Sequence, residues 1–168
     1  AINCYFSSIN LSHCTLNSNS ASEAGGIYIS YESFADISNS IISFSAVGEG
    51  IKHFDNGYAL ISWRNIFGNS DGDWTNEIID QLAFNNNMSL NPELCNSQEL
   101  PYLDYGSPCA YENNIECGLI GALPADCGAT DVLTEISKQI IFDVSCFPNP
   151  FNPSTTINYN IRDAGLVE

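Results

Sequence analysis

The residues best suited to bind a metal ion lie together in one acidic loop. Asp71 and Asp73 flank Gly72, and Asn69 precedes them, so that side-chain oxygens alternate around a turn. Calcium accepts a flexible shell of such oxygen ligands. We therefore take Asn69, Asp71 and Asp73 as the candidate calcium ligands. A plain acidic surface turn is the alternative, because no Glu stands where a bidentate ligand would complete the shell.

A second set of charged residues is of the kind that cleaves polysaccharides. Lys52, His53 and Asp55 share one predicted strand and its turn, while Asp36 and Arg64 fall on neighbouring segments. Glycoside hydrolysis needs two carboxylates at a set separation. The charged residues named here are scattered over several segments and do not predict such a pair. The chain also lacks a Gly-x-Ser-x-Gly elbow, a phosphate loop and a His-x-x-x-His metal pair. We predict no catalytic residue in it.

Aromatic side chains offer a third kind of chemistry, the stacking of sugar rings. Tyr28, Trp63 and Trp74 are the candidate binding residues, with Tyr31 beside them. Tyr28 alternates with two isoleucines and should point away from the core. Core packing is the alternative for the others.

The seven cysteines are many for a cytosolic chain of this size and indicate an oxidising compartment. We expect two disulfides, of undetermined pairing, among four that cluster in a loop-rich region: Cys95, Cys109, Cys117 and Cys127. Zinc is the alternative, but no Cys-x-x-Cys pair occurs and neither His13 nor His53 is near the cluster.

The charge limits the partners of this protein. The formal net charge is −16, which argues against nucleic acid or an anionic membrane as a partner. Direct capture of an acidic polysaccharide is also disfavoured, whereas neutral glycans, proteins and calcium are compatible with it. No apolar run approaches the length of a transmembrane helix.

The elements that would position these residues repeat along the first seventy residues. One block, centred on Gly-Gly-Ile, recurs at 2–4, 24–30 and 48–54. A second block recurs at 11–16, 37–42 and 62–67, which places Leu16, Ile42 and Phe67 one period apart. Short β-rich pieces between Gly, Asn and Ser turns, repeating every 25 residues or so, predict a β-solenoid. A β-sandwich ranks second, because it predicts no fixed register between blocks.

The pattern Gly-Gly-Ile followed by Ile-x-Asn-Ser-x-Ile resembles the right-handed parallel β-helix family of pectate-lyase-like and polymorphic outer-membrane proteins. The resemblance implies an all-β coil in which Asn39 and Asn65 either stack as ladders between coils or serve as turn residues. Polysaccharide lyases of this fold use calcium with an Arg or Lys base. The motifs of polygalacturonases are absent from this sequence.

The repeat breaks after Phe67, and residues 77–84 are spaced for one or two helical turns. The later order Asn-Pro-Glu-Leu, Tyr-Leu, Gly-Ser-Pro-Cys and Ile-Gly-Ala is similar to the closing segment of secreted bacterial β-helix proteins. It implies an irregular, disulfide-tied cap over the unpaired strand edges. Residues 1–127 are thus predicted to be the last coils and cap of a β-helix.

The tail carries an unusual proline-rich run: Phe147, Pro148, Asn149, Pro150, Phe151, Asn152 and Pro153. Prolines at this density impose an extended chain, and the alternation from Thr156 to Ile161 predicts a strand. The run resembles the opening of the C-terminal sorting domain of the bacterial type IX secretion system. That implies a linker at 128–139 and the first part of a β-sandwich at 140–168. We expect further coils before Ala1 and the rest of the sandwich after Glu168.

The sequence therefore predicts a secreted or cell-surface bacterial β-helix protein that is non-catalytic in this region. It would be adhesin-like or glycan-binding, with the type IX machinery as one partner and glycans or surface proteins as others. The alternative is the end of a polysaccharide lyase or glycoside hydrolase whose catalytic coils lie upstream. Fold alone does not separate the two, because β-helices serve both classes.

Overall fold

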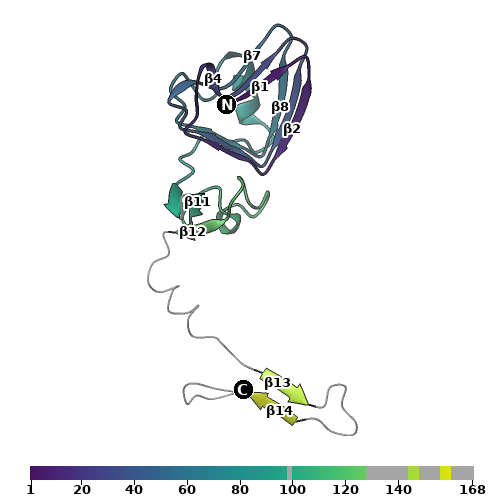
Figure 1. Cartoon of the computed structure of the whole chain (residues 1–168), viewed down its shortest axis with the longest axis vertical. Helices are drawn as coiled ribbons and strands as arrows, with labels where there is room; N and C mark the ends of the chain where they lie inside the picture. Colours follow the sequence, from purple (N-terminus) through teal and green to yellow (C-terminus); the bar gives the residue numbers. More distant parts are fainter. Residues whose placement is uncertain (98–99, 128–143, 148–155, 160–168) are drawn as a thin grey trace. The chain divides into compact units, whose positions relative to one another are not determined.

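The computed structural model describes residues 1–97, 100–127, 144–147 and 156–159 (Figure 1). The chain divides into two compact units, Ala1–Gly128 and Ala129–Glu168. The predicted linker at 128–139 and the prolines of the tail motif lie outside the described residues.

The first unit is a parallel β-solenoid in which each of three coils contributes three strands. Coil 1 has β1 (Ile2–Tyr5), β2 (Ser8–Ser12) and β3 (Thr15–Asn17). Coil 2 has β4 (Ser20–Ser30), β5 (Phe34–Ser38) and β6 (Ile41–Ser43). Coil 3 has β7 (Val47–Phe54), β8 (Tyr58–Ser62) and β9 (Asn65–Phe67). Equivalent strands pair in parallel to give the sheets β1-β4-β7, β2-β5-β8 and β3-β6-β9, and Figure 1 shows the strands stacked in this way.

The predicted repeat is confirmed, apart from one register. Ile2, Ile27 and Ile51 occupy equivalent positions in the three coils. In the second block, however, the residue of coil 3 that is equivalent to Leu16 and Ile42 is Ile66 and not Phe67. Because successive residues of a strand face opposite sides, this shift of one residue puts Ile66 in the core and Phe67 outside it.

The core of the coil is a stack of small and β-branched side chains. Ile29, Ile37 and Ile61 are fully buried in one apolar cluster. Gly26 is required beside them, because a Cβ at this position would overlap the carbonyl oxygen of Gly50 in the next coil. The Gly-Gly-Ile motif thus marks the place where two coils approach most closely.

Every corner of the coil contains a residue in the left-handed region. The corner after the first sheet uses Phe6, Tyr31 and Asp55, with φ values of 44°, 53° and 48°. The other two corners are built alike: His13, Asn39 and Trp63 at one, and Ser18, Phe44 and Gly68 at the next. The predicted asparagine ladder does not form, because Asn39 is at a corner whereas Asn65 pairs with Ile41 in β9.

The end of the coil after β9 is covered by residues 70–90. The 3-10 helix η1 (Asn76–Ala83) confirms the predicted helical turns and buries Ile78 against the core. Its Gln81 side chain accepts a hydrogen bond from the Ile61 amide (2.9 Å) and donates one to the Ala59 carbonyl (2.9 Å). Gln81 thereby satisfies the edge of β8 as a further strand would.

The disulfide-tied segment has a different position from the one predicted. It contains β10 (Leu94–Ser97), β11 (Leu100–Asp104), η2 (Tyr111–Asn113) and β12 (Ala125–Cys127). Instead of closing the end of the coil, it packs along the outside of the sheet β3-β6-β9 and is bonded to all three coils. These hydrogen bonds run from Ala122 to Thr15, from Gly121 to Asn39 and from Asn65 to Cys109. We call residues 92–127 the lateral brace.

Of the second unit the structure describes one antiparallel hairpin, β13 (Val144–Phe147) paired with β14 (Thr156–Tyr159). The strand predicted from the alternation after the prolines is therefore present. A sorting domain is not demonstrated by a hairpin alone, since two-stranded hairpins occur in many folds.

Candidate functional site

The acidic loop uses its carboxylates to hold the backbone. Both oxygens of Asp73 accept hydrogen bonds, from the amides of Gly68 (2.9 Å) and Asn69 (2.8 Å) and from the Asn69 side chain (2.7 Å). Asp71 accepts the Gly48 amide (3.1 Å). The three predicted calcium ligands thus lie together, yet their contacts are those of a turn that ends a coil. Calcium binding at this loop stays a prediction.

The charged residues considered for catalysis are not brought together. Lys52 lies on the outside of the first sheet and pairs with Glu23 (2.9 Å). His53 is at the register position of Ile29, and its buried Nε2 has no hydrogen-bond partner. Asp36 is on the outside of the second sheet, and Asp55 is in a corner. Among the residues that the structure describes, no three His, Cys, Asp or Glu side chains are grouped as they would be around a metal ion.

Arg64 is the most unusual charged residue. Its side chain is fully buried, and Nε, Nη1 and Nη2 have no hydrogen-bond partner. Burial lowers the pKa of Arg64 from its ordinary value to about 8, and the charge of Asp36 opposes this decrease only in part. A buried, unpaired guanidinium is costly, so Arg64 reduces the stability of coil 3 and is not a surface base.

The three predicted binding aromatics have three different environments. Trp74 is 8% exposed and belongs to the core, with its indole N–H unpaired. Trp63 is half-buried at a corner with φ 55°. Tyr28 is half-buried on the outside of the first sheet, where it lines a hollow of about 270 Å³ together with Asn3 and Glu23. They do not form one surface.

A different set of aromatic residues does gather on the outside of the coil. Around the corner between the first and second sheets, Tyr5, Phe6 and Tyr31 are in mutual contact, with ring centroids 4.8 to 5.4 Å apart. Beside them, at the start of the second sheet, Phe34 and Tyr58 stack at 5.9 Å with an interplanar angle of 18°.

We call these five residues, with Phe54, the aromatic corner. All six side chains are between 37% and 63% exposed. Phe54 is in register with Tyr5 and Ser30. Each coil therefore contributes at least one ring to the same side of the solenoid.

The aromatic corner is built at a cost in backbone energy. Phe6 and Tyr31 have positive φ values, which are unfavourable for bulky side chains and common for Asn or Gly. A ring in such a position gains little from burial, because it remains exposed. Positive φ values occur at every corner of the coil, so the exposed rings in mutual contact, and not the strain, make this corner the best candidate for a binding surface.

Of the six residues of this surface, sequence reasoning named only Tyr31. The missed signal was a pair of aromatic residues that recurs in each coil at the short connection between the first strand and the second. The pairs are Tyr5 and Phe6, Tyr31 and Phe34, and Phe54 and Tyr58. The signal could have been found by aligning these connections instead of the strands.

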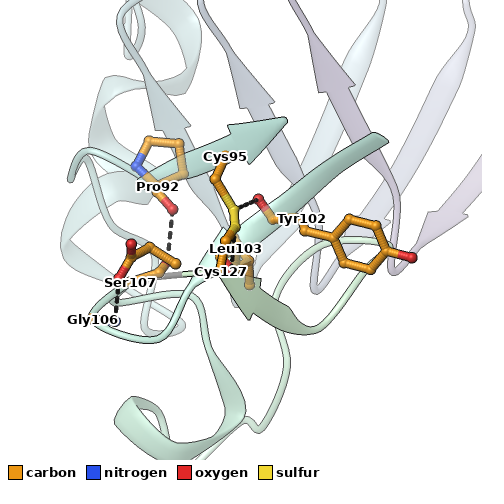
Figure 2. Close-up of a disulfide and its surroundings, with 8 residues drawn as sticks. Pro92, Cys95, Tyr102, Leu103, Gly106, Ser107 and Cys127 are labelled. Carbon is orange, nitrogen blue, oxygen red and sulfur yellow. Dashed lines mark hydrogen bonds between the residues drawn. A yellow bond between two sulfur atoms is a disulfide. The ribbon is translucent and has the colours of Figure 1, made fainter. Parts of the chain in front are cut away.

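The four clustered cysteines are partly cross-linked. Cys95 on β10 and Cys127 on β12 form a disulfide across β11 (Figure 2). The Cys95 sulfur also lies 3.5 Å from the Tyr102 carbonyl oxygen, and Ser107 donates a hydrogen bond to the carbonyl of Pro92 (2.7 Å). Cys109 and Cys117 are present as thiols, as are Cys4 and Cys14.

Comparisons with known proteins do not assign a family. No family model, no curated protein and no solved structure matches the chain. Among the residues described, no helix is long and apolar enough to cross a membrane. A functional assignment therefore has to come from the surface of the solenoid.

Proposed function

We propose that this region is a non-catalytic, glycan-binding or adhesin-like solenoid that binds neutral polysaccharides at the aromatic corner. The observation that carries the proposal is the set of exposed rings contributed by successive coils. The apolar faces of pyranose rings pack on such side chains, and a polymer can contact several coils at once. The charge of −16 favours neutral over acidic glycans because like charges repel.

The rings are spaced suitably for a chain molecule. Neighbouring strands of a sheet lie about 4.8 Å apart, and the Phe34 and Tyr58 rings of adjacent coils are 5.9 Å apart. A glycan that lies across the coils would therefore meet a new aromatic side chain at about the spacing of one sugar unit.

We further infer that the protein is exported. The seven cysteines, the Cys95–Cys127 disulfide and the resemblance of residues 147–153 to a type IX sorting motif support this inference. The parallel pairing of equivalent strands and the Gly-Gly-Ile repeat support a right-handed β-helix of the pectate-lyase-like kind, and the tail motif supports its attachment to the cell surface. The enzymatic alternative has no supporting observation within the described residues.

Affinity electrophoresis in gels that contain neutral polysaccharides (β-glucan, xylan, galactomannan) or acidic ones (polygalacturonate, alginate) tests the proposal. We expect the protein to be retarded by at least one neutral polymer and by no acidic one. Tyr31→Ala and Tyr58→Ala should each weaken that retardation about 3- to 10-fold, as expected for the loss of one aromatic contact.

Tyr111→Ala is the matched control, because Tyr111 is 66% exposed but belongs to the lateral brace. It should leave retardation unchanged. If no neutral polymer retards the protein, or if Tyr111→Ala has the same effect as Tyr58→Ala, binding at the aromatic corner is excluded.

A further inference from the structure

The lateral brace holds two thiols that its disulfide does not use. Cys109 is fully buried, and Cys117 packs against the same apolar cluster, which also contains Ile41, Leu103 and Ile120. These thiols therefore occupy one small region of the first unit.

The backbone between the two cysteines folds back on itself. The Ile120 amide donates to the Cys109 carbonyl (3.0 Å), and the Gly118 amide donates to the Asn114 carbonyl (2.7 Å). After Cys109 the chain makes the single turn η2 and then comes back beside Cys109 at Ile120. Cys117 lies three residues before Ile120 and is therefore near Cys109. The two thiols are also close enough to interact electrostatically, because Cys117 adds to the rise in the pKa of Cys109 that burial causes.

The other cysteines have different surroundings. Cys4 is in the core of the coil, with its sulfur near Ser7 (3.2 Å), and Cys14 is at a corner beside Ser12. Cys146 belongs to the second unit. Cys117 is the thiol that shares a cluster with Cys109.

From this arrangement we propose that Cys109 and Cys117 form a second disulfide when the chain folds in an oxidising compartment, so that the lateral brace is cross-linked twice. The pairs are Cys95 with Cys127 and Cys109 with Cys117, and the other two ways of pairing these four residues are excluded.

The oxidant is a disulfide, either of an oxidoreductase or of oxidised glutathione. The Cys117 thiolate attacks one of its sulfur atoms, which forms a mixed disulfide and releases one thiol. The Cys109 thiolate then attacks the Cys117 sulfur and releases the second thiol. The two cysteines together lose two electrons and two protons, and the oxidant disulfide is reduced to two thiols.

The bond forms before the brace is fully packed. In the folded, reduced chain, burial raises the pKa of Cys109 to about 11 and also raises that of Cys117. Few thiolates are then present, and attack on an oxidant is slow. Oxidation during folding, when both thiols are accessible, avoids this obstacle.

The second bond connects two points at which the brace holds the coil. The Cys117 carbonyl accepts a hydrogen bond from Asn39 of coil 2 (3.1 Å), and the Cys109 sulfur receives one from Asn65 of coil 3 (3.2 Å). Cross-linking these positions restrains the brace against the sheet β3-β6-β9.

Counting thiols in the full chain gives the first test. The chain is refolded with reduced and oxidised glutathione, unfolded without reductant and titrated with a thiol reagent. Two disulfides leave three of the seven cysteines free, whereas the Cys95–Cys127 bond alone leaves five. Five free thiols after oxidative refolding would overturn the proposal.

Digestion after glutamates then shows which peptides are linked. Cleavage after Glu93, Glu99, Glu112, Glu116 and Glu135 separates Cys95 and Cys109 from a peptide that holds both Cys117 and Cys127. With both disulfides, the peptides 94–99, 100–112 and 117–135 remain one linked species until reduction. If peptide 100–112 is instead released with an alkylated Cys109, the pair does not form.

Variants assign the bonds within this species. Cys117→Ser should release peptide 100–112 and keep 94–99 linked to 117–135. Cys127→Ser should do the reverse. A linkage of 100–112 that survives Cys117→Ser would contradict the pairing.

Discussion

Two outer faces of the same three coils differ in their exposure to solvent. On the sheet β3-β6-β9, outward-facing Ile41 is completely buried beneath the lateral brace. On the sheet β2-β5-β8, outward-facing Phe34 and Leu60 are 37% and 41% exposed. Both faces carry large apolar side chains, so composition does not distinguish them. The difference is the presence of a covering segment, which leaves one face accessible to solvent beside the corner where we propose binding.

The two faces also differ in how their corners are satisfied. Beside the brace, Asn39 is at a positive-φ corner and donates to the Cys117 carbonyl (3.1 Å). At the aromatic corner, Phe6 and Tyr31 occupy the same kind of position and contact mainly one another. Stability favours the first arrangement, and the second is the one at which we propose glycan binding.

The largest expected effect contrasts one aliphatic residue on each face. Ile41→Ala should destabilise the protein by about 2–5 kcal/mol, because it leaves a cavity between β6 and the brace. Leu60→Ala, on the uncovered face, should change stability by less than about 1 kcal/mol. Urea denaturation followed by circular dichroism measures both. Equal effects would mean that the brace does not cover its face in solution.

Arg64, at the corner that precedes the covered sheet, should show an intermediate effect of opposite sign. Arg64→Met removes an unpaired buried charge and should stabilise the protein by about 1–4 kcal/mol at pH 7. In the native protein, burial lowers the pKa of Arg64 from its ordinary value to about 8. The unfolded chain therefore binds more protons above pH 8, and the stability contributed by Arg64 rises as the pH increases.

Thermal unfolding of the two proteins at pH 7 and pH 9.5 checks both parts of this prediction. The stability advantage of Arg64→Met should shrink at the higher pH. An Arg64→Met protein that is less stable than the native one at pH 7 would show that the guanidinium has a partner.

The smallest effect tests the strain at the aromatic corner. Tyr31→Asn should raise the free energy of unfolding by about 0.5–1 kcal/mol, because Asn tolerates positive φ better than Tyr does. The same variant should lose affinity for the polysaccharide. Tyr58→Asn is the control, since Tyr58 begins an extended strand and Asn gains nothing there. A loss of stability in Tyr31→Asn would indicate that ring contacts outweigh the strain.

Part of the candidate site was predictable from the sequence. The outward position of Tyr28 and the turn at Asp71 to Asp73 followed from alternation and from turn composition, and both are present. Core packing of Trp74 was one of the two interpretations that the sequence allowed, and its burial confirms that one. The sequence could not decide between them, because Trp74 lies after the last repeat and just before η1. Its neighbours in sequence are polar, whereas its neighbours in space are the last isoleucines of the coil.

The sequence alone determined the solenoid, its three coils and nearly all of their register. These depend on short-range signals: alternation within a strand, glycines where two coils approach closely, and a repeat that returns in the next segment of the chain. Only the tertiary structure decided that residues 92–127 lie along one side of the coil, that Cys95 pairs with Cys127, and that the aromatic rings share an uncovered corner. Each of these depends on contacts between segments far apart in the chain. Local pattern has no bearing on such contacts, because the same alternating strand is stable whether its outer face meets protein or water.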